Sequence, residues 1–200
     1  MEYGNNKVVK LVFAALVGAV YAAITIAFAP ISYGQLQVRV SEALTLLPFF
    51  SSYSVWGLFA GCIIANIFGG AGIIDVVFGS LATLVAAWLT YLIGKSNLKY
   101  KRILAPMPPV VINAVVVGLI LKITLHLPLV ISMLWVGLGE FISCYVIGLM
   151  LLSVVEKNKK LMEYLRAWAK SGIFTALYFL PFRLRYYSYI SLFYTIIKIH

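Results

Sequence analysis

The sequence predicts an all-α protein that crosses a membrane as a bundle of six helices, the second of them short and broken. Three observations predict this class. Hydrophobic residues make up 63% of the 200 positions and charged residues 11%, whereas soluble domains carry roughly a quarter charged residues. Long apolar stretches alternate with short turns that contain Gly, Pro or Lys. Between Ala43 and Gly94 the only charged residue is Asp75. We expect one membrane-embedded domain over residues 1–156, followed by a separate tail over 157–200.

Each expected helix is bounded by residues that end helices. The first, 8–29, is long enough to span a bilayer, and we interpret it as a retained helix rather than a cleaved signal peptide. Pro30 and Gly34 end it. A short helix is expected at 41–50, and four longer ones follow at 53–69, 73–94, 103–125 and 129–155. These four are separated by the glycine-rich turn 69–72, the basic segment 94–102 and Leu127-Pro128.

Cations predict how the helices cross the membrane. They gather in three groups, and the positive-inside rule places all three in the cytoplasm, together with the N-terminus and the region of residue 156. The groups are Lys7 with Lys10, then Lys95, Lys99, Lys101 and Arg102, then Lys157, Lys159 and Lys160. An even number of spans must therefore separate consecutive groups. The result is a multi-pass protein of the cell membrane.

The even count requires residues 36–50 to cross the membrane. The stretch 103–155 supplies two spans, but 8–94 supplies only three obvious ones. As a helix, 36–50 rises about 22 Å, which is less than the ~30 Å hydrocarbon core, so we expect a partial span broken near Pro48. The alternative is a single kinked helix over 43–69, which gives five spans.

The tail departs from the rest of the chain in composition. Residues 157–200 hold eight of the 16 Lys and Arg residues, one of the six acids and 11 aromatic residues. In so apolar a chain this excess of positive charge indicates contact with anionic membrane lipid rather than with nucleic acid. Three interpretations stay open: an interfacial helix at 161–180, a seventh span, or translation out of the original frame. No function is assigned to the tail.

In this topology, polar residues from three connections gather near the outer membrane face and predict a site that opens outward. They are Gln35, Gln37, Arg39 and Glu42, then Asn66 and Asp75 around the glycine-rich turn, then Lys122, His126 and Pro128. Glu140 lies inside the last span, where a charge usually faces a partner or a cavity. Its alternatives are a ligand contact, a structural pair, for example with Lys122, or a protonated carboxyl. Asn113 must find an internal hydrogen bond, and Trp135 is either a stacking surface or an interfacial anchor.

Small residues recur along the first helix in two neighbouring rows. One row is Ala15, Ala19, Ala23 and Ala27, and the other is Ala14, Gly18 and Ala22. Such spacing lets another helix approach closely. The rows indicate either packing inside the protein or a docking surface for another membrane subunit.

Several chemistries are excluded by missing motifs. The sequence has no GxxxxGK[ST], HExxH or GxSxG, so neither a P-loop ATPase nor these hydrolases are indicated. Cys62 and Cys144 lie in apolar segments without CxxC spacing, and the chain holds two His residues, so no metal site is expected. The chain is therefore not expected to be an enzyme or to carry a cofactor.

The segments "QVRVSEALTLLPFF" and "GLFAGCIIANIFGGAGIIDVVFGSLATLVAAWLTYLIG" resemble the QueT family over about residues 7–160. The family comprises substrate-binding S components of energy-coupling factor (ECF) transporters for queuosine precursors. The resemblance implies six helices, a pocket near the extracellular side and docking of the alanine-rich first helix onto a transmembrane T subunit. Two partner ABC-type ATPases would hydrolyse ATP.

The resemblance also implies a substrate of the 7-deazaguanine type, in its aminomethyl or nitrile form. The expected contacts are acids at Glu42, Asp75 and Glu140, amides at Asn66 and Asn113, and a stacking surface at Trp135. Arg39 is expected to orient Glu42 or to close the gate. The alternatives are an S component or autonomous carrier for another small flat heterocyclic vitamin, and a membrane-embedded enzyme or assembly factor.

Overall fold

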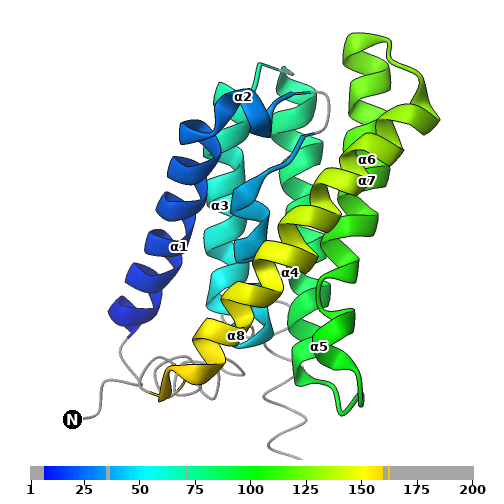
Figure 1. The fold of residues 1–200 in the computed structure, drawn as a ribbon. Helices are drawn as coiled ribbons and strands as arrows, with labels where there is room; N and C mark the ends of the chain where they lie inside the picture. The colour runs from blue at the N-terminus through cyan, green and yellow to red at the C-terminus, as the bar shows by residue number, and fades with distance from the viewer. Residues whose placement is uncertain (1–6, 35–36, 71, 160–161, 163–200) are drawn as a thin grey trace, which may run out of the picture. The chain divides into compact units, whose positions relative to one another are not determined.

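The structure, a computed structural model, describes residues 7–34, 37–70, 72–159 and 162. They all fall within one compact unit, Met1–Ala169. These residues form helices and connections, with no strand among them (Figure 1). Gln35 and the three interpretations of the tail lie outside the described residues, apart from the tail's first positions.

The N-terminal half contains α1 (Lys7–Ala27), α2 (Ala29–Ser32), η2 (Val40–Phe49) and α3 (Tyr53–Phe68). Pro30 stands in the first turn of α2, where its missing N–H costs nothing. The short second helix that the sequence predicted is η2, a ten-residue 3₁₀ helix that contains Pro48. At 2.0 Å per residue it rises about 20 Å, so it is shorter than the ~30 Å hydrocarbon core.

Two π-helical segments interrupt the C-terminal half. The segment η3 (Asp75–Gly79) leads directly into α4 (Ser80–Lys95), and α5 (Lys101–Leu104) precedes α6 (Met107–Leu125). Then α7 (Leu129–Phe141), η4 (Ile142–Gly148) and α8 (Leu149–Lys157) form one continuous helix. His126, with φ 56°, ends α6 in the left-handed conformation, as many helices end. Because π segments are frequent at functional sites, η3 and η4 indicate the region of a candidate functional site.

Four of these helices are long and apolar enough to cross a membrane: Lys10–Ala27, Asp75–Lys95, Lys101–Leu125 and Leu129–Lys157. Val40–Phe49 and Tyr53–Phe68 are apolar but shorter. Large apolar side chains such as Leu11, Leu134 and Met150 are about 70% exposed (71%, 68% and 67%), as expected where lipid replaces water. The chain is thus an all-helical, multi-pass membrane protein, and the six-span count remains a prediction.

The backbones of α1 and α3 touch through glycines, and the two helices lie side by side in Figure 1. A Cβ on Gly57 would lie 2.2 Å from the Ala14 carbonyl oxygen, and one on Gly61 would lie 2.5 Å from that of Gly18. Only glycine allows such an approach. The row Ala14, Gly18 and Ala22 is buried against α3, whereas the row Ala15, Ala19, Ala23 and Ala27 is exposed.

Contacts bring the cationic segments to one end of the bundle, at the bottom of Figure 1. The Lys10 ammonium lies 5.4 Å from the Tyr53 ring centroid, and that of Lys101 lies 5.8 Å from the Phe49 ring. Arg102 pairs with Glu156 at 3.2 Å. The first turn of α1, the junction of η2 with α3, α5 and the end of α8 therefore meet at this end of the bundle.

Candidate binding site

Six of the seven side chains predicted to bind substrate are buried. Arg39, Glu42, Asn66, Asp75, Asn113 and Glu140 are each 5% exposed or less, although all six carry charge or a polar amide. They come from η2 and its N-terminal boundary, the last turns of α3, the first residue of η3, the middle of α6 and the end of α7. Such groups are rarely buried in an apolar bundle without a partner or a function.

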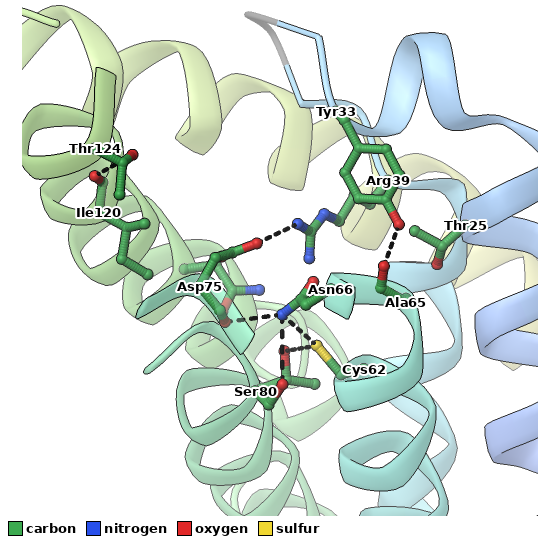
Figure 2. A network of polar contacts seen from close by, with 12 residues as sticks. Thr25, Tyr33, Arg39, Cys62, Ala65, Asn66, Asp75, Ser80, Ile120 and Thr124 are labelled. Carbon is green, nitrogen blue, oxygen red and sulfur yellow. Dashed lines mark hydrogen bonds and ion pairs between the residues drawn. The ribbon is translucent and has the colours of Figure 1, made fainter. Parts of the chain in front are cut away.

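Arg39 and Asp75 form the first part of the cluster, which Figure 2 shows. The guanidinium Nη2 of Arg39 lies 3.7 Å from Asp75 Oδ2, and its Cζ lies 5.5 Å from the Tyr33 ring centroid. The Tyr33 hydroxyl donates to the Ala65 carbonyl at 2.6 Å. Burial raises the pKa of Tyr33, so this hydroxyl stays a neutral donor. Arg39 was expected to orient Glu42; its ion pair forms with Asp75.

Asn66 fixes the start of η3 against α3. Its Nδ2 donates to the Asp75 carbonyl at 3.1 Å and lies 3.4 Å from Ser80 Oγ and 3.5 Å from Cys62 Sγ (Figure 2). Gly79 leaves room for the Asp75 carboxylate, because a Cβ there would lie 2.6 Å from Asp75 Oδ1. The amide thus holds the acid's backbone and leaves the acid's side chain free to face Arg39.

Two residues of α1 that the sequence analysis missed contact the start of η2 at Ser41 and Glu42. The Tyr21 hydroxyl donates to Glu42 Oε1, and Thr25 Oγ1 lies 2.6 Å from the hydroxyl of Ser41. Tyr21 and Thr25 are both fully buried. They stand four residues apart, on one side of an otherwise apolar helix. This four-residue spacing of two polar side chains is the sequence pattern that could have identified Tyr21 and Thr25.

Glu140 is enclosed by protein donors. Asn113 Nδ2 donates to its Oε1 at 3.1 Å, and the Cys144 thiol donates to its Oε2 at 3.7 Å. The same sulfur lies 3.6 Å from the Glu42 carbonyl oxygen, which joins η4 to η2. Arg39 interacts electrostatically with both Glu42 and Glu140. The alternative pair of Glu140 with Lys122 is therefore replaced by Asn113 and Cys144.

Several buried polar atoms in this cluster have no hydrogen-bond partner. Each of five predicted site residues has one: Arg39 Nε, Glu42 Oε2, Asn66 Oδ1, Asp75 Oδ1 and Asn113 Oδ1. An unpartnered buried polar group costs roughly 1–3 kcal/mol, more when charged, so native proteins keep few of them without a reason. A ligand that bonds to these atoms would remove the cost. Among the described residues no group of three or more His, Cys, Asp or Glu side chains could hold a metal ion.

Trp135 lies apart from this cluster. Its side chain on α7 is 44% exposed, whereas the six other predicted residues are buried. Tyr33, beside Arg39, and Tyr21, bonded to Glu42, are the aromatic residues that contact the cluster. The structure thus brings Tyr33 and Tyr21 to the cluster and leaves Trp135 partly exposed on α7.

Comparisons with known proteins agree on one family. The model of a family described as QueT transporter matches residues 11–157. The chain is also 36% identical over 83 residues to the Queuosine precursor transporter QueT of Lactococcus lactis subsp. cremoris (strain MG1363). That alignment covers 40% of this chain and 48% of the relative, so the chain spans about half the length of the curated relative it matches. No solved structure matches the chain.

Proposed function

Because the chain belongs to the QueT transporter family, we propose that it binds a queuosine precursor and serves as the S component of an ECF transporter. The observation that carries the proposal is the buried polar cluster, with its five unpartnered atoms on Arg39, Glu42, Asn66, Asp75 and Asn113. The transporter itself would consist of this chain, a transmembrane T subunit and two ABC-type ATPases.

The chemistry of a 7-deazaguanine suits these atoms. Its guanine-like edge places a ring N–H beside an exocyclic amine, and each of these donors can bond to a carboxylate oxygen. Glu42 and Asp75 each offer a free carboxylate oxygen, and Arg39 offers a free N–H. Tyr33 offers a ring face beside Arg39. Stacking on such a face contributes to binding of flat heterocycles.

The exposed row Ala15, Ala19, Ala23 and Ala27 supports docking onto the T subunit. The neighbouring row, which begins at Ala14, already packs against α3. The backbones are so close there that a Cβ on Gly57 would lie 2.2 Å from the Ala14 carbonyl oxygen. The alanine row remains exposed. Small residues let the backbone of a partner helix approach closely, which is how helices associate in lipid. The missing P-loop agrees with ATP hydrolysis by other subunits.

The proposal is tested by purifying the full chain in detergent and identifying the bound small molecule by mass spectrometry. We expect a 7-deazaguanine, and direct titration with the aminomethyl and nitrile forms should show saturable binding. Asp75→Ala should weaken binding by about tenfold or more, the effect of losing a hydrogen bond to a charged group. Glu156→Gln, at the cationic end of the bundle, is the matched control and should bind as the parent does.

Two results would contradict the proposal. A different co-purified heterocycle with no affinity for either 7-deazaguanine would assign another substrate. Uptake into vesicles that contain this chain alone, driven by an ion gradient, would make it an autonomous carrier rather than an S component.

A further inference from the structure

The orientation of the two buried amides is fixed by their partners. Asn113 Nδ2 donates to Glu140 Oε1 at 3.1 Å. Asn66 Nδ2 is likewise turned to the Asp75 carbonyl oxygen at 3.1 Å. Both amide oxygens therefore point away from these partners and have none of their own. Each amide offers the site an acceptor.

The two carboxylates that keep a free oxygen add two further acceptors. Asp75 directs Oδ2 toward Arg39, which leaves Oδ1, and Glu42 receives the Tyr21 hydroxyl on Oε1, which leaves Oε2. Both oxygens of Glu140 are already bonded by Asn113 and Cys144. The unpartnered atoms of the predicted site residues are thus four acceptors and one donor, Arg39 Nε. A complementary ligand must donate several hydrogen bonds and accept one.

Glu42 has no direct cationic partner among the described residues. Of the three acids in the cluster, it is Asp75 that pairs with the buried guanidinium of Arg39, at 3.7 Å. Glu42 has a neutral hydroxyl on one oxygen and no partner on the other. A buried carboxylate in that position is stabilised most by a cation, because a charge-assisted hydrogen bond is roughly twice as strong as a neutral one.

We infer that this site selects a cationic ligand rich in N–H donors, and that Glu42 Oε2 binds the positive charge. The inference rests on the proposed function and narrows it. Of the two 7-deazaguanine forms considered, the aminomethyl compound carries an ammonium group that donates hydrogen bonds, while the nitrile compound is neutral there and only accepts them. Arg39 Nε would donate to the ring carbonyl, which both forms share.

The test compares dissociation constants of the two forms for the full chain in detergent at pH 7. We expect the aminomethyl form to bind about tenfold more tightly or better. In Glu42→Gln the Tyr21 hydroxyl still finds an acceptor, but the negative charge is lost. In this variant the ratio of the two dissociation constants should fall about tenfold, because the interaction lost is the one with the ammonium group that only the aminomethyl form carries. Glu156→Gln, an acid at the other end of the bundle, should keep the parent's preference.

The outcomes separate this inference from the function it rests on. Equal or tighter binding of the nitrile form by the parent would overturn the inference while leaving a 7-deazaguanine as substrate. A preference that survives in folded Glu42→Gln would show that Glu42 does not bind the charge. If the parent binds neither form, the proposed function fails as well. Because the parent's preference is measured without any substitution, a variant that does not fold leaves the inference open to refutation.

Discussion

At the scale of single residues, the three buried acids differ in what their oxygens contact. Glu42 and Asp75 each keep an unpartnered oxygen, whereas Asn113 and Cys144 occupy both oxygens of Glu140. We propose that Glu140 orients Asn113, because Asn113 Nδ2 and the Cys144 thiol contact its two oxygens. The sequence located all three acids, because charge is conspicuous in apolar segments. It could not tell their roles apart, since those depend on neighbours from other helices.

The positioning role of Glu140 predicts a difference between two substitutions. Glu140→Met has a similar volume but accepts no hydrogen bond, so the Asn113 amide is released and ligand affinity should fall about tenfold or more. Glu140→Gln keeps an oxygen that Asn113 can bond, so it should retain most of the affinity. Calorimetric titration of both variants checks this, with a thermal melt to verify folding. Equal losses in the two variants would indicate that the charge of Glu140 acts on the ligand directly.

At the scale of helices, the sequence predicted the apolar segments closely. The expected 53–69 and 129–155 correspond to Tyr53–Phe68 and to the continuous helix Leu129–Lys157, because glycine, proline and basic turns bound them. The two π segments were not predicted, since a π turn leaves no mark on hydrophobic periodicity. Tyr21 was missed for a different reason: its role is fixed by its contact with Glu42 across two helices.

The close contact between α1 and α3 predicts that one methyl group added at their interface lowers the stability of the protein. Gly57→Ala would place a Cβ 2.2 Å from the Ala14 carbonyl oxygen, and overpacking of this kind costs roughly 1–3 kcal/mol. In Gly137→Ala the added Cβ meets Ala114 Cβ at 3.4 Å, an ordinary contact, so stability should hold or rise by up to ~1 kcal/mol. Unfolding measured in detergent should show that Gly57→Ala is less stable than Gly137→Ala. Matching stabilities would contradict the backbone contact.

At the scale of the whole molecule, the row Ala15, Ala19, Ala23 and Ala27 is the surface proposed to dock onto the T subunit. Replacing Ala19 and Ala23 with Phe should abolish co-purification of the T subunit and the ATPases, because the bulk blocks close helix approach. Ligand affinity should stay within about twofold of the parent. Val115→Phe adds the same ring at a 43% exposed position of α6 and should leave the complex intact. Retention of the partners by the double variant would place the docking surface elsewhere.

The sequence predicted this surface only in part. Both rows of small residues on the first helix had the spacing for close approach, and nothing in either row showed which of them faces outward. The glycines of α3 decide this, since Gly57 and Gly61 receive the backbone at Ala14 and Gly18. The even number of crossings stays a prediction, because it depends on the positions of Lys and Arg relative to a membrane.

One consequence concerns α1 itself, which carries the exposed alanines on one side and Tyr21 and Thr25 on the other. A helix with its side chains is about 10–12 Å thick, so the exposed alanines lie one helix away from the side that bonds Glu42. Whatever binds the alanines is therefore separated from the proposed binding site by α1 alone among the described residues. We expect a compound that binds this outer face to act on the proposed site through α1 without entering it.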